Sequence, residues 1–192
     1  MNDFVLPATR YALSGDVSIA YQVMGDAPID IIMVPGIASH VEFQHELPGY
    51  TAFLRRLATF ARVVTFDKRG QGLSDRISGA SSLEERMDDV RAIMDDVGTR
   101  QAVLLGFSEG AAMSTLFAAT YPERVSHLIL FGGYTRSFRT EEMILERVKL
   151  WGTGATAIKG LMPSQATNAD VVALLARFER LLPVRGRLKP IP

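Results

Sequence analysis

The chain alternates short apolar runs with segments in which apolar residues recur at every third or fourth position. The runs are too short for helices and predict buried strands, at Ile29–Val34, Arg62–Phe66, Gln101–Phe107 and Val125–Phe131. Ahead of them, two alternating stretches, Tyr11–Leu13 and Val17–Val23, flank the triplet Ser14-Gly15-Asp16, whose residue types favour a hairpin turn. The sheet is therefore expected to begin with an antiparallel hairpin and to continue with parallel strands.

Helical periodicity is strongest in Ser82–Val97. Ser82 and Glu85 match a capping box, and Gly98 supplies the residue type that ends helices. Two acidic pairs lie in this segment, Asp88-Asp89 and Asp95-Asp96. We expect them to form a solvated helix face rather than a metal site, since charged residues on a surface helix usually face water.

Further helices are expected at Leu47–Phe60 and from the residues after Ser108 to Thr120. Strands that alternate with helices predict an α/β fold with a mostly parallel sheet, whose ligands bind beyond the carboxyl ends of the strands. After Tyr134 the pattern changes to two helices without a strand, Thr140–Trp151 and Asn168–Leu182. We therefore divide the chain into a core at residues 1–134 and a partial helical cap with a divergent tail at residues 135–192.

Composition removes several classes of function. The chain has 192 residues with 47% hydrophobic content, and 21 basic residues balance 21 acidic ones, so no global charge attracts nucleic acid or an anionic membrane. It contains no cysteine, which excludes disulfides and thiolate chemistry. No apolar stretch is long enough for a membrane helix, and the first residues do not match a secretory signal. We expect a cytoplasmic protein that needs neither metal nor cofactor.

The candidate chemistry centres on Gly106-Phe107-Ser108-Glu109-Gly110, which follows a predicted strand and opens a helix. In that context a G-x-S-x-G motif is typical of a nucleophile elbow, in which a tight turn presents the serine hydroxyl. Glycine on both sides lets strand and helix approach closely. The plain alternative is a glycine-flanked turn that holds an unreactive serine. We predict Ser108 as a nucleophile and assign Gly106 and Gly110 a structural role.

An acyl-transfer site also needs donors for the oxyanion. One donor in this arrangement is the N–H of the residue after the nucleophile, here Glu109, and the second comes from the loop after an earlier strand. Pro35-Gly36-Ile37 occupies that loop, so the N–H of Ile37 is the second candidate.

The segment D-K-R-G-Q-G-L-S at Asp67–Ser74 carries a family resemblance. Together with the elbow it resembles the α/β-hydrolase fold family, which has a D-x-R-G-x-G-x-S segment two units before the elbow. Three further segments resemble the hydrolase domains found beside bacterial adenylate cyclase modules, namely Tyr11–Gln22, Val34–Glu42 and Trp151–Gly154. The resemblance covers Ala8 to about Arg180. It implies that Asp67 and Arg69 brace the loops around the site, and that an acid and a histidine follow two strands beyond the cap.

Those two triad members have no counterpart in this sequence. The histidines are His40, His45 and His127, and none follows a strand beyond the cap. We interpret His40 as a residue of the pocket mouth, His45 as a loop residue and His127 as a strand residue. The segment Leu181–Pro192 departs from the family pattern, which suggests a truncated or frameshifted reading frame.

The leading hypothesis is therefore a serine hydrolase acting on a small hydrophobic ester or acyl substrate, with weak or no activity in the isolated chain. Substrate contacts are assigned to Gly36, His40, Phe107, Met143 and Trp151. A second hypothesis is a noncatalytic module that senses a ligand or partner. A third is an incomplete fragment that self-associates through an unpaired sheet edge at Val125–Phe131.

Overall fold

A computed structural model describes residues 5–47, 49–79, 81–134, 140–155, 164 and 166–182. The chain divides into two compact units, Met1–Thr135 and Arg136–Pro192, which are described separately below. In the described part of the chain, no helix is long and apolar enough to cross a membrane.

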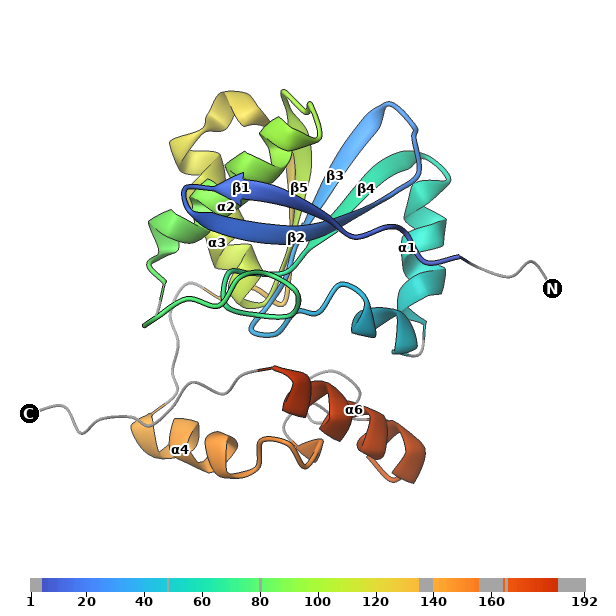
Figure 1. Ribbon diagram of the computed structural model, residues 1–192, viewed down its shortest axis with the longest axis vertical. Helices are drawn as coiled ribbons and strands as arrows, with labels where there is room; N and C mark the ends of the chain where they lie inside the picture. Colours follow the sequence, from blue (N-terminus) through green and yellow to red (C-terminus); the bar gives the residue numbers. More distant parts are fainter. Residues whose placement is uncertain are drawn as a thin grey trace, which may run out of the picture. The chain divides into compact units, whose positions relative to one another are not determined.

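The first unit is an α/β structure built on one mixed sheet (Figure 1). Its elements are, in chain order, β1 (Arg10–Ser14), β2 (Val17–Met24), β3 (Ile29–Val34), the 3₁₀ helix η1 (Phe43–Glu46), α1 (Tyr50–Ala58), β4 (Ala61–Phe66), α2 (Leu83–Asp96), β5 (Ala102–Phe107), α3 (Glu109–Thr120), the 3₁₀ helix η2 (Pro122–Arg124) and β6 (Val125–Phe131). The six strands lie in the order β1-β2-β4-β3-β5-β6. Pairing is antiparallel for β1 with β2 and for β2 with β4, and parallel for the remaining pairs. The predicted hairpin and the predicted α/β class are both confirmed.

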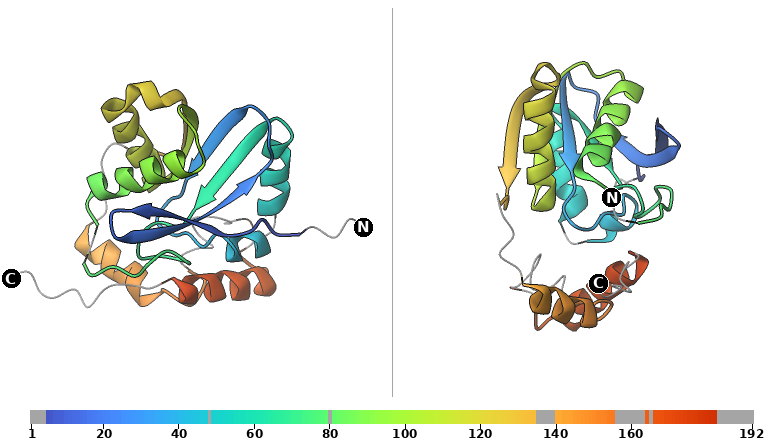
Figure 2. Two further views of the ribbon diagram at one scale, coloured as in Figure 1. Left: turned by 45° about the horizontal axis from the view of Figure 1, so that its top comes forward. Right: turned by 90° about the vertical axis from the view of Figure 1, so that its left-hand side faces the viewer.

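Each face of the sheet is covered by helices (Figure 2). Side chains alternate along β3, so Ile31 and Met33 pack in the cluster that includes Leu54 of α1, while Ile32 and Val34 pack with residues of α2 and α3. This two-sided burial explains why the central strands are continuous apolar runs. Parallel β3, β4 and β5 also bring the loops after their carboxyl ends to one edge of the sheet.

The ends of two helices show what local sequence does and does not specify. At α2 the capping box is confirmed, since the Ser82 hydroxyl accepts from the Glu85 N–H at 3.1 Å and the Glu85 carboxylate accepts from the Ser82 N–H at 2.8 Å. The predicted helix start at Leu47 is wrong, because α1 begins at Tyr50 after Gly49. Gly49 has φ +80°, a left-handed conformation that a continuous right-handed helix cannot contain.

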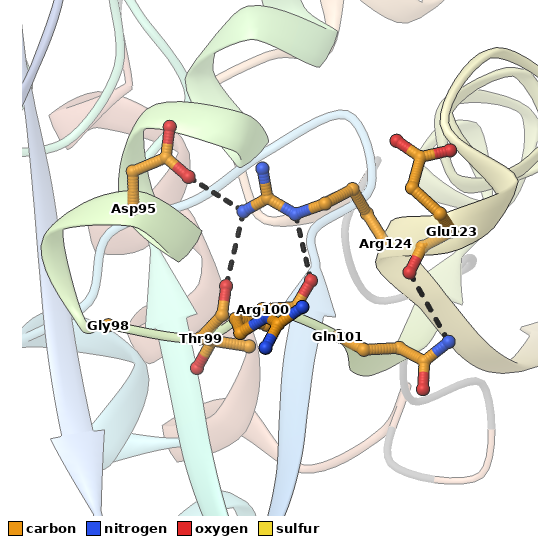
Figure 3. A pocket seen from close by; sticks show the side chains of 7 residues that line it. All are labelled: Asp95, Gly98, Thr99, Arg100, Gln101, Glu123 and Arg124. Carbon is orange, nitrogen blue, oxygen red and sulfur yellow. Dashed lines mark hydrogen bonds and ion pairs between the residues drawn. The ribbon is translucent and has the colours of Figure 1, made fainter.

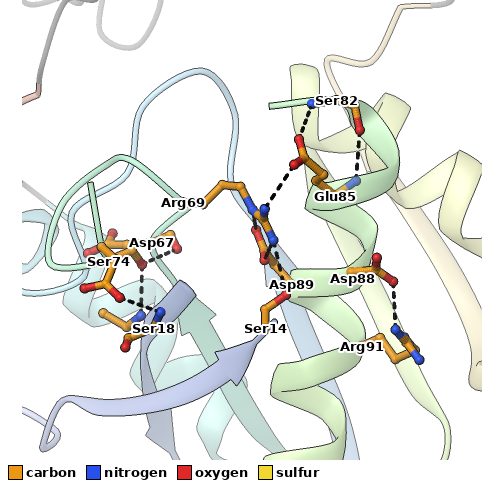
Figure 4. Close-up of polar contacts among 12 residues, drawn as sticks. Ser14, Ser18, Asp67, Arg69, Ser74, Ser82, Glu85, Asp88, Asp89 and Arg91 are labelled. Atoms are coloured by element: carbon orange, nitrogen blue, oxygen red, sulfur yellow. Dashed lines mark hydrogen bonds and ion pairs between the residues drawn. The ribbon is translucent and has the colours of Figure 1, made fainter. Parts of the chain in front are cut away.

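The prediction of a fully solvated acidic face on α2 is also wrong, and Asp89 shows why (Figure 4). Asp89 is 1% exposed and accepts from Arg69 Nε at 2.8 Å, while Arg69 also donates to the Ser14 hydroxyl. Asp88 does remain at the surface, paired with Arg91. Asp89 lies beside the apolar stripe of α2. It can be buried there because Arg69, from the Asp67–Ser74 loop, pairs with its carboxylate.

The described sheet ends on β6, whose side chains are exposed on both faces. Leu128, Ile129, Leu130 and Phe131 all exceed a third of their full exposure, and Phe131 reaches 69%. This agrees with an unpaired apolar edge, and self-association through it stays a prediction.

The second unit contains α4 (Glu141–Lys149) and α6 (Ala169–Leu181), capped at their N-termini by Thr140 and Asn168. The turn after α4 is tied to α6 by Glu179, whose buried carboxylate accepts from the N–H groups of Gly152 and Gly154 at 2.8 and 2.9 Å. The expected cap residues Leu161 and Met162 lie outside the described residues. Placement of these helices over the strand ends stays a prediction.

Candidate functional site

The turn after β5 holds Ser108 in a strained backbone conformation. Its φ of 52° makes it the one residue other than glycine with positive φ among those the structure describes. Such a conformation costs about 1–3 kcal/mol and persists only where the surroundings impose it. Here the surroundings are tight, because a Cβ on Gly106 would lie 2.7 Å from the Gly110 carbonyl oxygen, and one on Gly110 would lie 2.3 Å from that of Val34. The two glycines permit the turn, and the turn fixes the serine.

The loop after β3 reaches the same place. Gly36 packs so closely that a Cβ there would lie 3.3 Å from Ser108 Cβ. Behind them, the Ser108 N–H donates to the Phe131 carbonyl at 2.9 Å, and the rings of Phe107 and Phe131 are 5.8 Å apart. In the described part of the chain, no acceptor is found for the N–H of Ile37 or of Glu109. Two unused donors therefore flank a strained serine, although their role as an oxyanion site stays a prediction.

The side chain of Glu109 is held by two cations. Lys68 Nζ donates to one carboxylate oxygen at 2.9 Å, and Arg86 of α2 pairs with the other. Burial lowers the pKa of Lys68, partly offset by the Glu109 charge. Burial alone would raise the pKa of Glu109, but Lys68 and Arg86 outweigh it and lower that pKa. Glu109 therefore stays ionised beside the elbow.

Sequence reasoning missed both cations of this cluster. Lys68 occupies an unspecified position of the D-x-R-G-x-G-x-S segment and Arg86 lies outside the motifs, 41 and 23 residues from Glu109 along the chain. The one sequence signal for the Lys68 contact is the presence of a lysine after Asp67 and a carboxylate after the predicted nucleophile.

Asp67 lies at the centre of the neighbouring loop. It is fully buried and accepts from the N–H groups of Val41 and Leu73 at 2.9 and 2.8 Å. Burial nevertheless raises the pKa of Asp67 to about 7. Gly72 is required beside it, since a Cβ there would lie 2.1 Å from a carboxylate oxygen. Asp67 and Arg69 thus hold neighbouring segments through these contacts, and their predicted role in bracing an active site stays a prediction.

In the described residues, none of the three histidines hydrogen-bonds to Ser108. His40 Nδ1 accepts from the Phe43 N–H at 3.2 Å, so the proton of the neutral ring sits on Nε2, and burial lowers the His40 pKa. His45 lies in η1, not in an irregular loop as expected, and bonds to Thr51 and to Gln22 of β2.

His127 is excluded by the strand register. It lies opposite Val103, five residues before Ser108 along β5, which corresponds to about 16 Å. His127 is exposed on the edge strand, in agreement with the prediction that it is a strand residue.

The side chain of Ser108 makes no capping hydrogen bond to α3 in the described residues.

Met143 and Trp151 belong to the second unit. Met143 is 51% exposed, and the Trp151 indole N–H donates to the Glu179 carbonyl at 2.7 Å. Trp151 therefore has a local structural contact, and substrate binding by either residue stays a prediction.

A surface hollow of about 860 Å³ lies at the opposite end of β5 from Ser108 (Figure 3). It is lined by Asp95, Gly98, Thr99, Arg100, Gln101, Glu123 and Arg124. Arg124 spans it with bonds to Asp95, to the Arg100 carbonyl and to the Thr99 carbonyl. In the described residues, no cluster of three acidic, histidine or cysteine side chains could hold a metal ion.

The comparison with known families decides the broad assignment. The model of the alpha/beta hydrolase fold matches residues 31–179, more than half of the chain. The chain belongs to the α/β-hydrolase family. The resemblance read from the elbow and the D-x-R-G-x-G-x-S segment is thereby confirmed, and the narrower likeness to cyclase-associated domains stays a prediction.

Similar proteins are hydrolases of several kinds. A 2-hydroxy-6-oxononadienedioate/2-hydroxy-6-oxononatrienedioate hydrolase of Paraburkholderia phymatum is 37% identical over 45% of this chain and 32% of its own. Serine hydrolase BPHL of Homo sapiens is 26% identical over 74% of this chain and 48% of its own. Among solved structures, a hydrolase from Pseudomonas aeruginosa has a TM-score of 0.73 at 24% identity, with 90% of this chain and 66% of that chain covered.

A meta-cleavage product hydrolase has a TM-score of 0.69 at 25% identity, with 91% of this chain and 62% of that chain covered. The chain thus spans between about a third and two thirds of the length of these relatives. A hydrolase family is shown, and the reaction and substrate of this chain are proposals.

Proposed function

We propose that this protein is a serine hydrolase that acts on a small hydrophobic ester or related acyl substrate, with Ser108 as nucleophile. The observation that carries the proposal is the positive φ of Ser108 at the carboxyl end of β5, between two glycines that cannot carry a Cβ. That geometry costs free energy, and strain of this kind clusters at active sites, where a nucleophile elbow presents the serine. The hydrolase names of the similar proteins agree with it.

In the proposed reaction, Ser108 Oγ bonds to the acyl carbon, and the N–H groups of Ile37 and Glu109 stabilise the oxyanion that forms. The bond from the acyl carbon to the alcohol oxygen then breaks, and the proton released by the serine passes to the departing alcohol. Water hydrolyses the acyl-serine to release the acid and restore the hydroxyl. Both proton transfers need a base, and in the described structure no histidine hydrogen-bonds to Ser108. We therefore propose weak or no turnover by the 192-residue chain.

The proposed apolar preference rests on Phe107, which directly precedes the serine and is half-buried. Substrate binding by Met143, an exposed residue of the second unit, stays a separate prediction. Gly36 lets the loop after β3 pack closely against Ser108, and His40 Nε2 carries a proton that a polar substrate atom would accept. These residues favour a small acyl group with one hydrogen-bond acceptor.

Phosphonylation by a fluorophosphonate probe tests the assignment, with Ser108→Ala as control. A serine without a histidine base reacts only as its rare alkoxide, so we expect slow labelling at Ser108 whose rate climbs steadily from pH 7 to 10. Labelling that persists in S108A would contradict the nucleophile assignment. Fast labelling with a plateau near pH 7 would show that a base is in place, and would overturn the proposed weak activity.

A noncatalytic ligand-binding module is the second candidate. It is favoured by the His40 tautomer, since the Nδ1 lone pair is already occupied by the Phe43 N–H and cannot take a proton from serine. Thermal-shift measurements with small esters and carboxylic acids distinguish the two, because binding without hydrolysis raises the melting temperature by mass action. A compound that stabilises both wild type and S108A without being consumed would favour this reading.

A further inference from the structure

One loop, Asp67–Ser74, contacts both segments that carry the proposed oxyanion donors. Ile37 follows β3, whereas Glu109 begins α3 after β5. The distance between their N–H groups is therefore not set by the geometry of either element alone. It depends on side chains that connect the Pro35–Val41 loop to the first turn of α3.

Gln71 makes the connection to the first donor. Its Nε2 donates to the Ile37 carbonyl at 2.8 Å, and its Oε1 accepts from the N–H and the hydroxyl of Ser39 at 3.0 and 3.2 Å. The amide therefore holds the chain on the carboxyl side of Ile37. Gly36, packed against Ser108, holds the other side. These two contacts restrain the backbone on both sides of the Ile37 N–H.

Lys68 makes the connection to the second donor. Its N–H donates to the Ser39 hydroxyl at 3.0 Å, and its buried Nζ donates to the Glu109 carboxylate at 2.9 Å. Arg86 takes the other carboxylate oxygen. A carboxylate paired at both oxygens cannot rotate freely, so the first residue of α3 is fixed in orientation.

The loop that carries Gln71 and Lys68 is itself anchored. Asp67 accepts from Val41 and Leu73, and the Ser74 hydroxyl donates to the Asp67 carbonyl at 2.7 Å and accepts from the Ala20 N–H at 2.9 Å. The loop is therefore tied to β2 and to its own two ends. The anchored loop therefore holds the Ile37 segment through Gln71 and the start of α3 through Lys68.

We infer that Gln71 and Lys68 are positioning residues, which set the separation of the Ile37 and Glu109 N–H groups across Ser108. The inference rests on the proposed function for its catalytic meaning, although the positioning itself is a property of the backbone. Neither residue is required to touch the substrate. A displacement of about 1 Å at a reacting centre costs up to about 100-fold in rate, so small shifts of these N–H groups are measurable.

The first test follows the backbone directly, by amide N–H spectra of the 192-residue chain. We expect Gln71→Ala to shift the resonances of Ile37 and Ser39 and to leave Glu109 unchanged. Lys68→Met is expected to shift Glu109 far more than Ile37. Glu109→Gln weakens the same ion pair with little change in shape, and replaces K68M if that variant does not fold. The inference would be overturned by an unchanged Ile37 resonance in Q71A together with an unchanged Glu109 resonance in K68M. In E109Q, the neighbouring Gly110 resonance is read instead.

The second test measures fluorophosphonate labelling of Ser108 at pH 9. We expect Q71A and K68M each to slow labelling by about 10- to 100-fold. If each positions a different donor, the losses multiply in the double variant. Lys68→Arg keeps the positive charge and is expected to recover part of the rate, which a loss of general stability would not predict.

Matched controls come from the amino ends of the parallel strands. Gln101→Ala also removes an amide that donates to a carbonyl, and Arg62→Met also leaves a partly buried carboxylate, Asp30, without its cation. We expect both to retain the wild-type labelling rate and the wild-type Ile37 and Glu109 resonances. If labelling of Ser108 were slowed equally in Q101A and Q71A, Gln71 would have only a general structural role. Absent labelling in wild type would contradict the proposed function alone, because the resonance shifts would still report the positioning.

Discussion

The two ends of β5 carry similar residue types but differ in how their polar groups are used. At the carboxyl end, Ser108 is strained, two N–H groups lack acceptors among the described residues, and a lysine is buried against Glu109. At the amino end, Arg124 satisfies two carbonyls and a carboxylate around the hollow. Strain and unused donors therefore distinguish the carboxyl end, where the site is proposed, whereas the hollow lies at the amino end.

Ion pairs at the two ends give the largest expected contrast. Arg69→Met leaves Asp89, 1% exposed, without its cation, and we expect a loss of about 3–5 kcal/mol in the free energy of unfolding. Arg124→Met breaks a pair with Asp95, whose side chain is 58% exposed, and is expected to cost about 1 kcal/mol from that pair. Urea denaturation of both variants measures the difference. Equal losses would show that burial does not separate the two ends.

Carboxylates at the two ends give opposite pH dependence. Because burial raises the pKa of Asp67 to about 7, the folded state keeps its proton between pH 4 and 7 while the unfolded state loses it. Asp67 therefore makes stability fall by about 3 kcal/mol as pH rises through that range. Burial also opposes ionisation of Asp30, but hydrogen bonds from Arg62 and Thr99 prevail and lower its pKa, so its stabilisation is lost as pH falls below 4.

Wild type is compared with Asp67→Asn and Asp30→Asn by urea denaturation from pH 3 to 8, so that other titrating groups cancel. The difference between wild type and D67N is expected to change between pH 4 and 7, and that for D30N only below about pH 4. A wild-type stability that falls no faster than that of D67N from pH 4 to 7 would contradict a raised Asp67 pKa.

Glycines at the two ends give the smallest contrast. A Cβ on Gly110 would meet backbone carbonyls, whereas one on Gly98 would meet nothing within 4 Å and would only strain a φ of +70°. We expect Gly110→Ala to cost about 3 kcal/mol and Gly98→Ala about 1 kcal/mol. G110A is also expected to abolish Ser108 labelling, since the elbow cannot form. Full labelling of G110A would refute the claim that close packing enforces the strain.

Much of the fold was predictable because its signals are local. The apolar runs of the central strands, the capping box at Ser82 and the glycines of the elbow act over a few residues. The start of α1 was less predictable, because apolar periodicity extends back to Leu47 and does not show that Gly49 adopts a left-handed conformation. Asp89 was assigned to solvent because an acidic side chain is exposed in most surface helices.

The sequence by itself determined the family, the strained serine and the identity of the two candidate donors, since each depends on contiguous residues and on the absence of a Cβ. Only the tertiary structure decided which charges meet. Lys68 reaches Glu109, Arg69 reaches Asp89 and Gln71 reaches Ile37 across 20 to 41 residues of chain. Such pairings depend on which face each helix turns to its neighbours and on how close the loops approach, and no local pattern encodes that geometry.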